Sequence, residues 1–156
     1  MPNRPAFKGL EELPGHHIRR LQQIAVGIFI EETAEHGVTP VQFALLFAVR
    51  KEAGLDQRTV ARRIGFDTST IGAVVDRLES RGLIERRVSP DDKRVRLLRL
   101  TAAGEATLKR VIPGMLRAQQ RMLEPLPKAD RPRFMRMIRR IVDTNNEFSR
   151  AAKDTG

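Results

Sequence analysis

Residues 55–106 read LDQRTVARRIGFDTSTIGAVVDRLESRGLIERRVSPDDKRVRLLRLTAAGEA. Two short helical patterns open this segment. Asp56 and Asp67 stand where helix N-caps are expected, and Gly65 suits the left-handed residue that ends the first helix. The second pattern spaces its apolar residues at i, i+3, i+4 and i+7 and ends before Gly82; these residues are Ile71, Val74, Val75 and Leu78. Two short helices joined by a glycine turn predict a helix-turn-helix.

Two short segments rich in β-branched residues and leucine, residues 83–88 and 95–100, follow the second helix. The sequence SPDDKR between them predicts a β-hairpin whose tip carries Lys93 and Arg94. Thr101 can then cap a long helix, which Pro113 and Gly114 are expected to kink or interrupt.

Helical patterns also flank this block. The apolar spacing predicts a helix over residues 13–33, and the capping box TPVQ at Thr39 predicts another that runs to about residue 51. A last helix is expected to carry one apolar face, made of Phe134, Met137, Ile138, Ile141, Asn145 and Phe148. These stripes exceed what the compact block can cover, so dimerisation is expected to bury the surplus.

The fold class is therefore mainly α with a small β-hairpin wing. We expect one structural unit with three parts: a dimerisation helix in residues 9–36, a winged helix-turn-helix in residues 37–101, and two further dimerisation helices in residues 102–150.

Charge and composition narrow the function. The 156 residues hold 29 Lys and Arg against 19 Asp and Glu, a net charge of +10. Such a balance favours a polyanionic partner, nucleic acid first and an acidic membrane surface second. The longest apolar run, residues 24–30, is too short to cross a bilayer, and the N-terminus lacks a secretory signal, so a cytoplasmic protein is expected. The absence of cysteine excludes thiolate catalysis, thiolate metal ligands and a cysteine redox switch.

No glycine-rich phosphate loop, dinucleotide fingerprint or nucleophile elbow occurs in the sequence. The adjacent His16 and His17 point about 100° apart on a helix, and His36 is distant in sequence, which disfavours a metal site. We therefore expect a binding protein without a cofactor rather than an enzyme.

The start of the second short helix offers hydroxyl side chains and free backbone N–H groups that fit a DNA groove. Thr68, Ser69 and Thr70 form this turn, although the same hydroxyls are common capping chemistry. Arg58, Arg62 and Arg63 precede it. Between residues 81 and 99, seven basic residues face three acidic ones and should neutralise phosphates, unless they are only a solvated charged surface; they are Arg81, Arg86, Arg87, Lys93, Arg94, Arg96 and Arg99.

The same segment resembles the winged helix-turn-helix core of the multiple-antibiotic-resistance regulator (MarR) family. The matches are DRLESRGLI at residues 76–84, SPDDKR at 89–94 and LTAAG at 100–104, with TPVQFALL at 39–46 and the flanking helices. The resemblance implies a two-fold dimer on double-stranded DNA, with the second helix of each motif in successive major grooves and the wing in the minor groove.

The resemblance also suggests roles for single residues. It implies that Arg77 contacts phosphate and that Asp92 orients Arg94 in the wing. Gly72 and Ala73, however, stand where many family members carry polar or basic residues. Base readout is therefore expected to rest on residues 68–70, with more of the specificity left to DNA shape.

A helical wheel places His17 inside an apolar arc, with His16 and Arg20 at its border. Such residues are often a satisfied core histidine and a surface arginine. The functional reading is that they meet an anionic ligand at the edge of an apolar cavity. Walls suggested by position alone are Leu21, Phe43, Phe47 and Ile112.

The segment LPGHHIRRLQQ is similar to that of family members that sense aromatic acids or their coenzyme A thioesters. We therefore expect a repressor that a small aromatic carboxylate or its thioester releases from an inverted-repeat operator. Two alternatives stay open at this point: an architectural protein that binds duplexes without a ligand, and an interaction protein that recruits an acidic partner.

Overall fold

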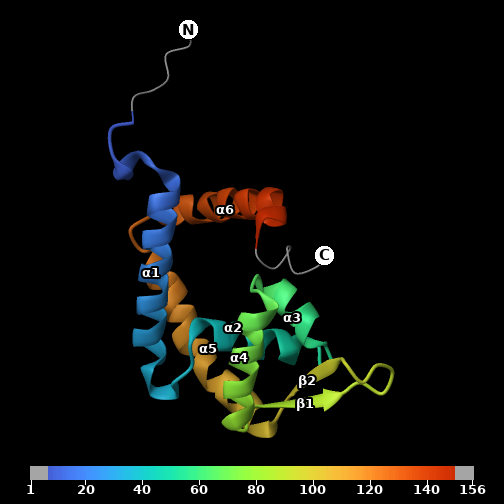
Figure 1. Cartoon of the computed structure of the whole chain (residues 1–156). Helices are drawn as coiled ribbons and strands as arrows, with labels where there is room; N and C mark the ends of the chain where they lie inside the picture. Colours follow the sequence, from blue (N-terminus) through green and yellow to red (C-terminus); the bar gives the residue numbers. More distant parts are fainter. Residues whose placement is uncertain (1–6, 150–156) are drawn as a thin grey trace.

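The computed structural model describes residues 7–149, so Arg150, at the end of the predicted C-terminal segment, lies outside the described residues. Figure 1 shows α1 and α5 side by side, the winged part at one end of this pair and α6 across the other. The elements are η1 (Leu10–Glu12), α1 (Pro14–Thr33), η2 (Ala34–His36), α2 (Pro40–Lys51), α3 (Gln57–Ile64), α4 (Thr68–Ser80), β1 (Ile84–Val88), β2 (Arg96–Leu100), α5 (Ala102–Leu123), η3 (Lys128–Asp130), α6 (Arg131–Asn145) and η4 (Asn146–Phe148).

The predicted helix caps are confirmed. Thr39 forms the capping box, since its Oγ1 accepts from Gln42 N–H at 3.2 Å and Gln42 Oε1 accepts from Thr39 N–H at 3.1 Å. Asp56 and Asp67 each accept a backbone N–H three residues on. Gly65 ends α3 with φ 76°, a backbone conformation that glycine adopts without steric cost.

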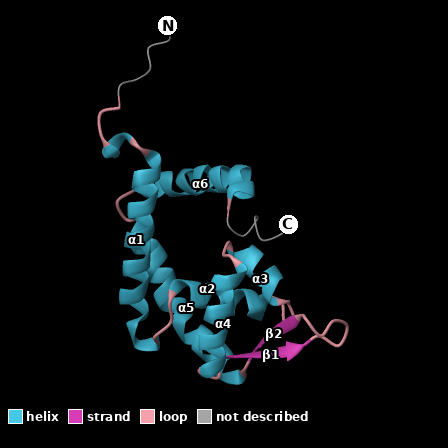
Figure 2. Cartoon of the chain, in the orientation of Figure 1, coloured by secondary structure: helices cyan, strands magenta, loops and turns pink. Residues whose placement is uncertain are grey.

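The hairpin is antiparallel and pairs Ile84 with Leu100 and Val88 with Arg96. The two strands form the one sheet within residues 7–149, and the rest of these residues are helical or in loops (Figure 2). Each strand starts one residue later than predicted, because Leu83 N–H donates to Leu78 O behind α4 and Val95 N–H donates to Asp92 O inside the turn.

The structure corrects two predictions about the flanking helices. Of the predicted kink or interruption at Pro113 and Gly114, the interruption is wrong, because α5 is continuous from Ala102 to Leu123. Gly114 instead serves packing: a Cβ there would lie 2.5 Å from the Glu32 carbonyl oxygen, so glycine lets α5 approach the backbone of α1. The last α-helix is also shorter than predicted, and Phe148 lies in the short helix η4 that follows it.

The main core joins α2, α3, α4, the hairpin and the start of α5. A smaller cluster sits between α1 and α5 and consists of Phe29, Val38, Val111 and Ala118. Phe43 packs against both clusters and so links the winged part to the long helices. No residue of α6 is buried. Within residues 7–149, no helix combines the length and apolarity needed to cross a membrane.

Candidate DNA-binding interface and effector site

The second helix of the helix-turn-helix, α4, has one face in the core and the other in solvent. Ile71, Val75 and Leu78 are fully buried, while Ser69, Ala73 and Arg77 are exposed. These exposed residues follow one side of α4 from its first turn onward. The helix therefore carries the side-chain distribution required of an element that enters a groove.

The first turn of α4 is held by its cap. Asp67 Oδ1 accepts from Thr70 N–H at 2.7 Å, and Thr70 Oγ1 donates to Asp67 Oδ2 at 2.9 Å. The Thr70 hydroxyl is thus engaged inside the protein, and only its lone pairs remain for DNA. Thr68 is half-buried, and Ser69 is the exposed hydroxyl of this turn.

The tip of the wing presents a fixed guanidinium. Arg94 donates from Nε to Asp92 Oδ1 at 3.2 Å and from Nη2 to Asp92 Oδ2 at 3.1 Å, while the Arg94 N–H also donates to Oδ1. Hydrogen bonds from Arg94 hold the pKa of the Asp92 carboxyl below its usual range. The Arg94 side chain stays 91% exposed. Asp92 therefore orients Arg94 outward while leaving it open to a phosphate or a groove.

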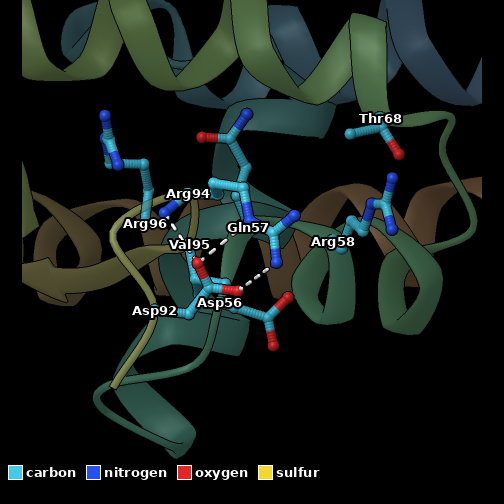
Figure 3. Close-up of a pocket in the computed structure, with 8 residues that line it drawn as sticks. All are labelled: Asp56, Gln57, Arg58, Thr68, Asp92, Arg94, Val95 and Arg96. Atoms are coloured by element: carbon cyan, nitrogen blue, oxygen red, sulfur yellow. Dashed lines mark hydrogen bonds and ion pairs between the residues drawn. The ribbon is translucent and has the colours of Figure 1, made fainter. Parts of the chain in front are cut away.

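A hollow of about 480 Å³ separates the wing from the start of α3 and α4. Figure 3 shows its lining, which unites four residues that the sequence predicted separately, Arg58, Thr68, Asp92 and Arg94, and adds Asp56, Gln57, Val95 and Arg96. Three guanidinium groups border this hollow. Such a concentration of positive charge beside the start of α4 suits a nucleic acid backbone.

Arg86 has a role that sequence reasoning missed. Its Nη2 donates to Asp76 Oδ1 at 2.6 Å and to Glu79 Oε1 at 3.0 Å. Hydrogen bonding from Arg86 lowers the pKa of Glu79, and the reciprocal interaction raises the pKa of Arg86. Arg86 therefore ties β1 to the outer face of α4. The pairing joins a strand to a helix, so the period of neither element relates Arg86 to its partners.

The seven basic residues between positions 81 and 99 therefore divide into two groups. Arg81 donates to Gly37 O at 2.9 Å, and Arg87 pairs with Glu85 at 3.3 Å. Together with Arg86, they lie before the turn of the wing, at the end of α4 and on β1. The other four lie in the turn of the wing or on β2, where Arg94 pairs with Asp92 and Arg96 donates to Lys93 O at 2.7 Å; they are Lys93, Arg94, Arg96 and Arg99.

Known proteins resemble this chain in sequence and in fold. A family model described as MarR family matches residues 36–95. A regulatory protein for the hcr operon of Thauera aromatica is 33% identical over 134 residues, covering 85% of this chain and 81% of that protein. The chain belongs to the MarR family. Its members are transcriptional regulators, so this MarR-family chain is a DNA-binding regulator and not an enzyme.

Solved structures extend this MarR-family match over most of the chain. The PcaV transcriptional regulator from Streptomyces coelicolor, in complex with its natural ligand, is 41% identical with a TM-score of 0.82, covering 88% of this chain and 97% of that one. The transcriptional repressor CouR, bound to a 23-mer DNA duplex, is 33% identical with a TM-score of 0.79, covering 85% of this chain and 94% of that one.

The residues predicted to bind an effector lie on two helices of this MarR-family fold, α1 and α2. His17 is exposed, and its Nε2–H donates to Glu11 O at 2.7 Å. The apolar arc predicted around His17 is exposed in the single chain, where Leu13 is 39% and Ile24 50% exposed. His16 is half-buried; its Nδ1 accepts from Arg19 at 3.2 Å, and burial together with the neighbouring Arg19 lowers its pKa. Arg20 is exposed.

The predicted rings Phe43 and Phe47 lie on α2 and meet the C-terminal half of α1 at Phe29. Phe43 stacks on Phe47 with ring centroids 6.0 Å apart, and Phe29 lies 6.0 Å from Phe43. Phe29 follows Arg20 by nine residues, which is about 14 Å along a helix at ~1.5 Å per residue. One chain therefore does not bring the predicted cations and the predicted rings together around a small molecule. Leu21 is half-buried between these two places.

Proposed function

We propose that this protein is a homodimeric repressor that binds an inverted-repeat operator and is released from it by an organic anion, an aromatic carboxylate or its coenzyme A thioester. Residues 37–101 contact DNA, while residues 9–36 and 102–150 hold the dimer. The observation that carries the proposal is the hollow between the wing and α4, where the outward-held Arg94 and the start of the groove-entering helix face the same space.

The dimer is supported by the apolar surface of α6 and its neighbours. Met137, Ile141 and Val142 are each at least half exposed, and Leu116 on α5 is 53% exposed. Large apolar side chains exposed on both helices support an interface with a second copy of the chain. A two-fold axis would place two copies of α4 about one helical turn of DNA apart, which predicts an inverted repeat.

Arg94 provides the test of DNA binding. We expect Arg94→Ala to weaken binding to a selected operator by roughly tenfold or more, because a positioned cation is lost from the groove. Arg133→Ala on α6 removes the same charge far from the wing and is the matched control. Competition experiments at one salt concentration measure both. Equal binding by Arg94→Ala and wild type would remove the wing from the mechanism.

The effector proposal is supported by the relatives and by the cations of α1. CouR has also been solved bound to p-coumaroyl-CoA, and the DNA binding of BpsR from Bordetella bronchiseptica is regulated by 6-hydroxynicotinic acid. Both compounds are aromatic. In this chain, His16, His17 and Arg20 supply donors for an anion at the N-terminal half of α1, with Leu21 beside them. Phe43 and Phe47 on α2 contact α1 at Phe29, which lies about 14 Å along α1 from Arg20. They would meet the same ligand only across a dimer or through its thioester arm.

Calorimetry with hydroxylated benzoates and their thioesters tests the effector. We expect binding to wild type and a marked loss in His17→Ala and Arg20→Ala, while operator binding without ligand is unchanged. Reciprocal linkage requires that operator DNA weaken ligand binding by the same factor by which the ligand weakens DNA binding. Undiminished affinity in both variants would place the pocket elsewhere.

An architectural role is the second candidate, favoured by the net charge of +10. Affinities for selected and random duplexes in the same salt distinguish the two. A specific regulator should prefer its operator by roughly a thousandfold or more, whereas an architectural protein should show similar affinity for both.

A further inference from the structure

We propose that Gln57, the first residue of α3, reads a base edge in the operator and supplies the polar contact that α4 lacks at Gly72 and Ala73. This inference rests on the DNA-binding function proposed above. It assigns sequence readout to a residue outside the groove-entering helix, because the side chain of Gln57 reaches across to the backbone of that helix.

The close approach of Gln57 to α4 is the first observation. A Cβ placed on Gly72 would lie 3.4 Å from Gln57 Nε2. The amide therefore lies against the second turn of α4, beside two residues that carry no polar side-chain atom. Figure 3 shows the amide extending from α3 away from the Asp92 and Arg94 pair.

The hydrogen-bonding capacity of the amide is the second observation. Within residues 7–149, no hydrogen bond engages the side chain of Gln57, although the residue is half-buried. Thr70, by contrast, donates its hydroxyl to Asp67. Gly72 and Ala73 have no polar side-chain atom. Gln57 thus offers both a donor and an acceptor where the neighbouring part of α4 offers neither.

The charges around Gln57 decide between a phosphate and a base as its partner. Arg58, Arg94 and Arg96 line the same hollow and are the better ligands for phosphate. A neutral amide adds little to that attraction. Its paired donor and acceptor instead match the N7 and N6 groups that adenine presents in the major groove. The geometry therefore points to a preference for an A·T pair at one position of each half-site.

The test is selection of bound duplexes from a pool with a randomised centre, carried out with wild type and with Gln57→Ala. We expect wild type to enrich an inverted repeat, and Gln57→Ala to lose the preference at one position of each half-site by roughly tenfold. The other positions and the salt dependence should be unchanged, since no charge is removed. Gln57→Glu should move the preference at that same position toward cytosine, whose amino group a carboxylate can accept.

Gln23→Ala, an exposed glutamine on α1, is the matched control, and the melting temperature of each variant checks its fold. Base preferences of Gln57→Ala identical to those of wild type would overturn the proposal, because Gln57 would then only pack against α4. A uniform loss across all sequences would overturn it in favour of a phosphate contact. A wild-type protein that enriches no sequence would instead overturn operator recognition itself, so the two failures are distinguishable.

Discussion

The helices α4 and α6 are both amphipathic, but the apolar face of α4 is buried and that of α6 is not. In α4, four apolar residues are buried against α2, α3 and the hairpin. In α6, which is two residues longer, no residue is buried, and Met137, Ile141 and Val142 face solvent. The difference shows that an amphipathic pattern identifies the face of a helix that can be buried, but not the surface that buries it. The winged region buries its apolar faces within one chain, whereas residues 7–149 leave the apolar face of α6 exposed.

Paired truncations should expose this contrast most strongly. Leu78 in α4 is fully buried, so Leu78→Ala is expected to lower the free energy of unfolding by about 2–5 kcal/mol. Ile141 is 57% exposed, so Ile141→Ala should leave the stability of the dissociated protomer nearly unchanged. Urea unfolding at low protein concentration measures both. Comparable losses would mean that α6 has a core partner within the chain.

A charge introduced into the apolar face of α6 should weaken dimerisation and leave the folding of each chain intact. Ile141→Asp would place an unpaired carboxylate in the proposed dimer interface, which should weaken dimerisation by about 3 kcal/mol. Sedimentation equilibrium would then show monomers where wild type shows dimers, with circular dichroism unchanged. Asp143→Asn, at an exposed position of the same helix, is the control for altered charge. Equal dimer constants for Ile141→Asp and wild type would exclude this face from the interface.

The contrast also explains what the sequence could predict. The caps at Thr39, Asp56 and Asp67 were predictable because each depends on residues within one turn. The role of Arg86 was not, because its partners on α4 are related only by the packing of β1. The exposure of His17 was missed for a related reason: a helical wheel identifies an apolar arc but cannot tell whether this chain or a second one covers it.

At the crossing of α1 and α5, two glycine substitutions should change the stability by smaller amounts and distinguish packing from helix propensity. Gly114→Ala puts a methyl 2.5 Å from the Glu32 carbonyl oxygen and should destabilise the fold by about 1–3 kcal/mol. Gly27→Ala, on α1 with no heavy atom within 4 Å of the added methyl, should stabilise it by about 0.5–1 kcal/mol. Thermal unfolding of the two variants should therefore shift in opposite directions. Stabilisation by both would mean that α1 can move away from α5 at no cost.

The smallest expected effect lies at the same crossing and depends on pH. Hydrogen bonds from Arg117 and then Arg121 lower the pKa of Glu32, to which these arginines donate at 2.8 and 2.7 Å. A carboxyl whose pKa is lower in the folded state stabilises the fold above its unfolded pKa, about 4.3, and this contribution is lost as the pH falls through the folded pKa. Glu32→Gln should therefore melt at a lower temperature than wild type at pH 7, and the difference should disappear in strong acid.

The control is Glu35→Gln, at an exposed position that forms no ion pair within residues 7–149, and its melting temperature should follow that of wild type at every pH. Because solvent screens these groups, the shift should be small and should shrink further in high salt. A difference between Glu32→Gln and wild type that persists unchanged into acid would mean that Glu32 acts through packing instead of charge.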